Sequence, residues 1–205
     1  MVFADETSHE LGEHMRQWVQ RPRGTKYAYM EKYMCHEKSH DAKIHVFGYI
    51  AANGRGGIDQ FTENLDKTLL KKILQRNRQP ILHVFPEYVL WYFLWDNDKK
   101  HTSDLVREWL HNNGITQVDY PPYSADINII ENVWYDVKHR VEARDPKNEQ
   151  DLKRIWQEEW KNTDKMFVMR LVHSMPAQCQ AIINAQGDHI PFIIENKQEH
   201  ANCSQ

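Results

Sequence analysis

Residues 88–103 read YVLWYFLWDNDKKHTS, and this stretch decides the fold class. Tyr88 to Trp95 are apolar without alternation, and their aromatic and β-branched content favours a strand buried on both faces. A carboxylate, Asp96, follows that strand directly. A strand buried on both faces needs helices on both sides of its sheet. The stretch therefore predicts an α/β protein with a carboxylate at the carboxyl end of a strand.

Four other segments read as strands of the same sheet. Val2 to Ala4 read as the end of a first strand, and Lys43 to Ala52 as a second. Asn53-Gly54 supplies a hairpin turn, because both residues tolerate positive φ, and the chain returns over Ile58 to Phe61. Ile115 to Tyr120 completes the set. A hairpin-rich start followed by strand–helix–strand units predicts an α/β fold, a mixed five-stranded sheet flanked by helices.

Apolar residues recur at helical spacing in five further segments. One helix starts at Thr102 or Ser103 and ends at Gly114, and another opens at Asn148. The others are expected over residues 64–76, along an apolar stripe from Ile130 to Val141, and over residues 165–185 with an interruption near Pro176. Trp134 lies on the apolar stripe, which favours a core position over base stacking.

The bulk composition suits one globular domain. The chain has 205 residues, of which 40% are hydrophobic and 27% charged, a typical balance for a folded soluble domain. No apolar run reaches the roughly 18 residues of a membrane span, and MVFADETSHE lacks the features of a signal peptide. Three scattered cysteines, Cys35, Cys179 and Cys203, predict a reducing compartment with neither a disulfide framework nor a zinc site.

The formal net charge of −3 limits the kind of partner. A complete DNA-binding protein is usually more basic, so contact with nucleic acid must be local or must depend on a basic module elsewhere. Basic clusters occur at Arg21 to Lys26, Lys67 to Arg78 and Lys138 to Arg140. Such clusters are common on soluble domains and are first interpreted as solvated faces.

Three carboxylates on separate elements are the candidate catalytic residues. Asp96 follows a buried strand, Glu131 stands in the first helical turn after Asn128, and 34 residues separate the two. Asp5 follows the first strand segment, and on a strand only one of Asp5 and Glu6 can face the site. Each has a structural explanation by itself: a turn for Asp96, a capping box with Asn128 for Glu131, and a solvated strand end for Asp5.

Together the three carboxylates indicate a metal site. Unit charges ~4 Å apart repel by about 4 kcal/mol per pair at an effective dielectric of 20, so bound cations must offset the repulsion. Oxygen ligands without Cys or His at ligand spacing favour Mg²⁺ or Mn²⁺. Two such ions would stabilise the attacking and the leaving oxygen of a phosphodiester displacement. The constellation of Asp5, Asp96 and Glu131 therefore predicts two-metal phosphoryl transfer.

Two motifs carry a resemblance to a known family. WDNDKKHTSDLVREWL (residues 95–110) and DYPPYSADINIIENVWYDVKHRV (residues 119–141) resemble the catalytic domain of mariner-superfamily DNA transposases, the Tc-one/mariner group. VFADET at residue 2, IHVFGYIAANGRG at 44, PKNEQDLKRIWQEEW at 146 and SMPAQCQAIINAQG at 174 extend the similarity. The resemblance covers residues 2 to about 190. The 34-residue interval is the one expected in the Tc-one branch.

The resemblance implies an RNase H-like fold over residues 1–190, followed by a polar tail at 191–205. It implies a catalytic Asp–Asp–Glu triad of Asp5, Asp96 and Glu131, which would bind two Mg²⁺ or Mn²⁺ ions. The family cleaves DNA at transposon ends and joins the 3′-hydroxyl to target DNA, typically at a TA step. Transposon-end and target DNA are thus the expected partners, with a homodimer as a further one, in the nucleus and without a membrane.

The sequence departs from the family pattern in ways that leave a second function open. Lys99, Ala125 and Ile129 stand where the family usually has proline. The paired helix-turn-helix domains that bind transposon ends in the family are expected to be absent from these residues. The alternative is a truncated or co-opted fragment that binds DNA or protein without catalysis. An RNase H-like nuclease of other specificity is a third reading.

His101 follows the second aspartate of the motif and has two readings. In the first, it lies near the site and contacts DNA or a metal-bound water. In the second, it forms hydrogen bonds at the start of the following helix, and the sequence slightly favours this one.

Overall fold

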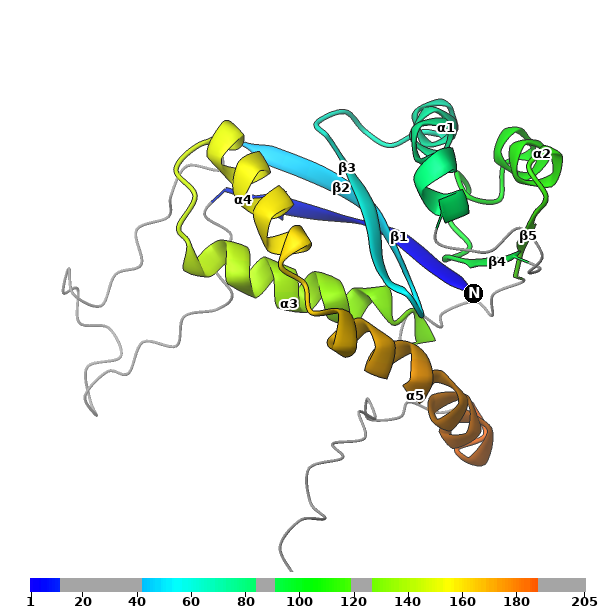
Figure 1. Cartoon of the computed structure of the whole chain (residues 1–205). Helices are drawn as coiled ribbons and strands as arrows, with labels where there is room; N and C mark the ends of the chain where they lie inside the picture. The colour runs from blue at the N-terminus through cyan, green and yellow to red at the C-terminus, as the bar shows by residue number, and fades with distance from the viewer. Residues whose placement is uncertain (12–41, 84–90, 119–126, 188–205) are drawn as a thin grey trace, which may run out of the picture.

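A computed structural model describes residues 1–11, 42–83, 91–118 and 127–187 of the chain (Figure 1). Its centre is one five-stranded sheet with the strand order β3-β2-β1-β4-β5. The strands are β1 (Val2–Glu10), β2 (Lys43–Ala51), β3 (Gly54–Phe61), β4 (Trp91–Leu94) and β5 (Ile115–Gln117). The β1–β2 and β2–β3 pairs are antiparallel, whereas β1–β4 and β4–β5 are parallel. The predicted mixed sheet is therefore confirmed.

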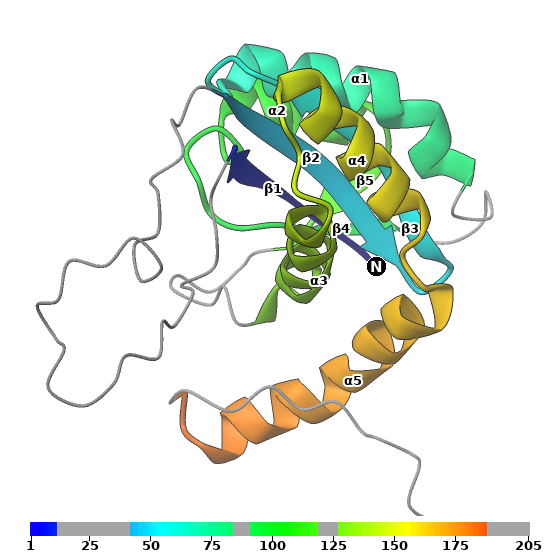
Figure 2. The ribbon, with the colours of Figure 1, turned by 90° about the vertical axis from the view of Figure 1, so that its left-hand side faces the viewer.

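Within the described ranges, five helices pack on the two faces of this sheet (Figure 1). They are α1 (Lys67–His83), α2 (Asp104–Asn112), α3 (Ile130–Ala143), α4 (Glu149–Lys161) and α5 (Lys165–Asn184). Figures 1 and 2 show α1 and α2 on one side of the sheet and α3 and α4 on the other. None of the helices in the described ranges has the length and apolarity needed to cross a bilayer.

The alternation of side chains along β1 separates two hydrophobic cores. Phe3 packs with the residues of α3 and α4, whereas Val2 and Ala4 pack with those of α1 and α2. Trp134 is 1% exposed in the α3 core, so its predicted core position is confirmed. The same alternation assigns the next two residues of β1 to opposite faces: Asp5 to the α3 side and Glu6 to the α1–α2 side.

Two predictions about the strands were wrong. β1 does not end at Ala4 but continues to Glu10, because every residue from Val2 to Glu10 pairs with β2. Asp5 therefore lies inside a strand and not at its carboxyl end. The hairpin turn consists of Ala52 and Asn53, because Ala51 already pairs with Gly54, where φ is +117°. Residues 84–90 and 119–126, which include the start of the predicted fourth strand and the end of the fifth, lie outside the described ranges.

The expected interruption near Pro176 was also wrong, since α5 is continuous across it. Proline removes one backbone donor from a helix interior. The buried side of α5 compensates: Val168 and Leu171 belong to the α3 core, and the Gln178 amide donates to the Ser174 hydroxyl at 2.7 Å. Pro176 itself is exposed, so its ring avoids the core. Tertiary packing thus outweighs the local cost.

The start of α4 is confirmed at atomic detail and offers a stability test. Asn148 precedes the helix in an extended conformation, and its Oδ1 accepts from the Asp151 amide at 2.9 Å. We expect Asn148→Ala to lower the free energy of unfolding by about 1 kcal/mol, because a helix N-cap contributes that much. Denaturant titration measures it. Asn112→Ala, at an exposed position in α2, serves as the control and should cause no loss.

Candidate active site

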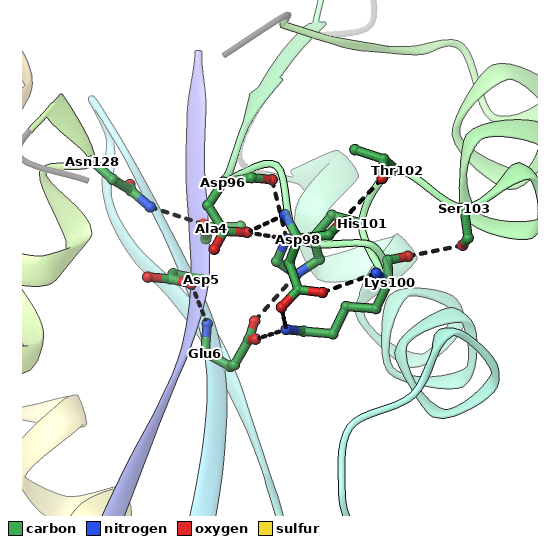
Figure 3. Close-up of polar contacts among 10 residues, drawn as sticks. All are labelled: Ala4, Asp5, Glu6, Asp96, Asp98, Lys100, His101, Thr102, Ser103 and Asn128. Atoms are coloured by element: carbon green, nitrogen blue, oxygen red, sulfur yellow. Dashed lines mark hydrogen bonds and ion pairs between the residues drawn. The ribbon is translucent and has the colours of Figure 1, made fainter. Parts of the chain in front are cut away.

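Asp5 lies on β1 and faces α3 (Figure 3). It is only 7% exposed, and its Oδ1 accepts the amide hydrogen of Glu6 at 2.8 Å. Burial, a hydrogen bond with Glu131 and the charge of that carboxylate, in this order of size, raise the pKa of Asp5 to about 9. A hydrogen bond between two carboxyl groups requires a proton on one of them. Asp5 and Glu131 are thus brought into direct contact.

Glu131 reaches Asp5 from the first turn of α3, where its side chain is exposed. The side-chain cap from Asn128 is not formed: Ile129 is the residue that precedes α3, and Asn128 Oδ1, the atom that would accept in a cap, has no hydrogen-bond partner. Asn128 is 2% exposed, and its Nδ2 donates to the Ala4 carbonyl oxygen at 3.4 Å. Only its backbone oxygen accepts from the Glu131 amide, at 3.0 Å. Asn128 therefore ties the start of α3 to β1, beside Asp5.

Asp96 follows the end of β4, the strand that pairs with β1. Val2 pairs with Phe93 and Phe3 with Leu94, so each aspartate lies two residues beyond the last paired residue of its own strand. Asp96 is half exposed. Its Oδ1 accepts from the Asp98 amide at 3.1 Å and from His101 Nδ1 at 2.5 Å. The hydrogen bond from His101 lowers the pKa of Asp96 more than any other contact, although partial burial opposes the shift.

Sequence reasoning missed the contact between His101 and Glu6. His101 is 0% exposed, so it does not reach the surface as the DNA-contact reading requires. Its ring stacks on Trp95, with centroids 4.4 Å apart, and its Nε2 lies 3.2 Å from Glu6 Oε2. Burial opposes a charge on His101, but its bonds with Asp96 and Glu6 raise its pKa to about 9. Both ring nitrogens then donate to carboxylates.

A signal for this pair was present in the sequence. Strand alternation already turned Glu6 away from Asp5, towards the face that carries the segment after β4. The sequence did not reveal which residue would contact the Glu6 carboxylate. Lys100 adds a second contact, since its Nζ forms ion pairs with Glu6 and, at 2.6 Å, with Asp98. Asp98 also stabilises the turn after β4, because its Oδ1 accepts from the Lys100 amide at 3.0 Å.

The donor chemistry fits a hard divalent cation, although the arrangement is not a closed metal cage. In the ranges that the structure describes, no group of three or more His, Cys, Asp or Glu side chains is close enough to hold a metal ion. Asp5 pairs with Glu131, and Asp96 with His101. The candidate ligands are nevertheless all oxygens, as Mg²⁺ and Mn²⁺ prefer. Asn128 Oδ1 is also buried beside Ala4 without a hydrogen-bond partner.

The sheet, its helices and the carboxylates on β1, after β4 and on α3 define the class of an RNase H-like nucleic-acid-processing domain, and comparison with known proteins gives the family. Residues 1–153 match the family described as DDE superfamily endonuclease, and the chain belongs to it. It is 29% identical over 190 residues to the Tc1 transposase of Caenorhabditis elegans, covering 91% of this chain and 68% of that protein. It is also similar to the Tcb1 transposase of Caenorhabditis briggsae, with 28% identity over 188 residues, covering 91% of this chain and 68% of that protein.

The fold has close counterparts among solved structures. The mariner Mos1 paired-end complex with Mg superposes with a TM-score of 0.79 and 17% identity, over 93% of this chain and 56% of that one. The Mos1 mariner paired-end complex with Mn gives 0.77 and 17%, over 93% and 56%. At this identity the similarity shows the fold alone. The chain spans little more than half the length of these Mos1 chains.

Proposed function

We propose that the chain is the catalytic domain of a cut-and-paste DNA transposase, which cleaves DNA strands and joins the 3′-hydroxyl end to a target. The single observation that carries the proposal is the contact between the buried carboxyl group of Asp5 on β1 and the exposed side chain of Glu131 on α3, in a domain of the DDE endonuclease family. Asp96, which follows β4 by two residues, completes the proposed triad.

A divalent cation is the proposed cofactor. The two Mos1 complexes described above contain Mg and Mn, and the oxygen donors of this chain suit either ion. Asp5, Asp96 and Glu131 would hold the metal, two ions in the full proposal. When bound, the ions would supply electrostatic stabilisation to the attacking and leaving oxygens of the phosphodiester. Displacing the proton between Asp5 and Glu131 would make both carboxylates available as ligands.

The residues of the chain have distinct proposed parts in this reaction. Asp5 is held by the Glu6 amide inside a rigid strand, so its position changes little when DNA arrives. Glu131 is exposed at the start of α3 and faces the incoming phosphodiester. DNA is the proposed partner, as in the Mos1 paired-end complexes, and a homodimer and a nuclear location are further proposals.

One observation favours the second candidate, a fragment that binds DNA or protein without catalysis. Asp96 Oδ1 is engaged by His101, and three carboxylates are not gathered around one point in the described part of the chain. The two candidates differ in whether metal binds. A measurement of metal binding therefore separates the two candidates.

We expect Mg²⁺ or Mn²⁺ to raise the melting temperature of the wild type and to leave Glu131→Gln unchanged. A ligand present at a hundred times its Kd stabilises by about 2.7 kcal/mol, which corresponds to about 5–10 °C for a chain of this size. Glutamine retains the size of the side chain but lacks the charge that binds a cation. Thermal melting across a metal titration measures the shift.

Glu108→Gln is the matched control for this titration. Glu108 is exposed on α2, and the substitution makes the same change in charge away from the site. The control should respond to metal as the wild type does. A wild-type melting temperature that does not respond to either ion would reject the metal-dependent function and favour the binding fragment.

A further inference from the structure

Two donors converge on one oxygen of Asp96. The Asp98 amide and His101 Nδ1 both bond to Oδ1, at 3.1 and 2.5 Å. A half-exposed aspartate after the end of a strand would otherwise exchange between rotamers. The two hydrogen bonds to Oδ1 fix the plane of the carboxylate. They leave Oδ2 as the oxygen that is available to bind a cation.

His101 is itself held in one orientation. Its ring lies 8° from parallel to Trp95, whose side chain is fully buried. Its backbone amide donates to the Asp98 carbonyl oxygen at 2.9 Å, and its Nε2 contacts Glu6 at 3.2 Å. The position of the imidazole is therefore set by stacking, by the turn and by a carboxylate of another strand. An imidazole fixed in this way is a rigid support for Asp96.

Glu6 connects this support to Asp5. The two are consecutive on β1, and Figure 3 shows Glu6 directed to His101 and Lys100, whereas Asp5 lies towards Asn128. β1 and β4 pair at Val2–Phe93 and Phe3–Leu94. The contact between Glu6 and His101 extends the connection of these strands beyond that last pair, to the segment that carries Asp96. One strand thus sets the positions of both aspartates.

We propose that Glu6 and His101 are positioning residues that orient Asp96 to bind the catalytic cation, through the chain of contacts Glu6–His101–Asp96 (Figure 3). The proposal rests on the proposed metal-dependent function and deepens it. Neither residue contacts the metal or the DNA in this role. Their contribution is to hold Asp96 in the geometry that octahedral Mg²⁺ or Mn²⁺ demands.

The test is the affinity of the protein for Mn²⁺ alone, measured by the paramagnetic resonance signal of free Mn²⁺. His101→Phe keeps a ring to stack on Trp95 but removes both hydrogen bonds. His101→Asn loses the stack but keeps an amide donor near the place of Nδ1. We expect affinity to decrease in the order wild type, Asn variant, Phe variant, with a loss of about 10–100-fold for phenylalanine. Melting temperatures without metal should rank the two variants in the opposite order.

A purely structural role would make affinity follow stability. The proposal is overturned if the Phe variant binds Mn²⁺ as tightly as the wild type, or more tightly than the Asn variant. If neither His101 variant folds, Glu6→Ala tests the other end of the pair, and a loss of less than about threefold overturns the proposal. His111→Phe, exposed near the end of α2, is the control and should bind normally. A wild type that binds no Mn²⁺ rejects the proposed function itself, and the positioning role with it.

Discussion

Replacing Asp96 with asparagine is expected to reduce metal-dependent DNA nicking by at least about a thousandfold, because a catalytic cation contributes several kcal/mol to the transition state. Asparagine keeps the size of the side chain and can still accept hydrogen bonds at Oδ1 from the Asp98 amide and His101. The fold should therefore persist. What is lost is the negative charge that would bind the cation.

The measurement is the conversion of supercoiled plasmid to the nicked form with Mg²⁺ and with Mn²⁺. Asp104→Asn is the matched control, since Asp104 is exposed at the first position of α2 and undergoes the same change. It should cut at the wild-type rate. Nicking by the Asp96 variant at the wild-type rate would remove Asp96 from the proposed triad.

Replacing Asp5 with asparagine should stabilise the metal-free protein at neutral and alkaline pH while removing its response to metal. The pKa of Asp5 is raised to about 9, mainly by burial, from an ordinary value of 3.8. Between these values the folded protein holds a proton that the unfolded chain has released. Stability therefore falls as pH rises through this window, by up to about 1.4 kcal/mol per pH unit.

Asparagine cannot ionise, so the variant lacks this dependence on pH. Its amide can donate to Glu131, and its oxygen can accept from the Glu6 amide as Asp5 does now. Functional carboxylates commonly lower the stability of the protein that carries them. The wild-type residue is thus expected to cost stability that only a bound cation restores.

Denaturant unfolding at pH 5, 6.5 and 8 without metal measures this effect. His101 contributes a slope of the same sign, because its pKa is raised to about 9 from 6.5 and its stabilising contribution is lost as pH rises through that range. The difference between wild type and Asp5→Asn is therefore the quantity to compare. It should grow from pH 5 to pH 8. A difference that stays constant with pH would contradict the assignment of a retained proton to Asp5. For the control Asp104→Asn, the difference from wild type should not change with pH.

The elements that the sequence predicted well are those with strong local patterns. The apolar run before Asp96 identified the strand β4, although Tyr92 on it is 42% exposed, and Asn148 identified the start of α4. Trp134 and its stripe identified the buried side of α3. In each case the period of apolar residues or a capping side chain reports on neighbours within a few residues, so no tertiary information was needed.

Predictions failed where distant residues decide. The apolar run at the start of the chain ends at Ala4, but β1 continues to Glu10 because each of its residues pairs with β2. Asn128 suits a helix cap, but its Nδ2 donates to the Ala4 carbonyl oxygen of β1 and its Oδ1 caps no backbone amide. Pro176 should interrupt a helix, but burial of one side of α5 sustains it. Local preference was overruled each time by a partner far along the chain.

The sequence by itself determined the order of the strands and helices, the family resemblance and the choice of Asp5, Asp96 and Glu131, because spacing and side-chain type are written in it. Only the tertiary structure decided that Asp5 contacts Glu131 while Asp96 is held by His101. It also decided that Glu6 reaches His101 across the sheet. The physical reason is that hydrogen bonds between buried polar groups depend on which faces and strands the fold brings together, and local sequence does not encode that.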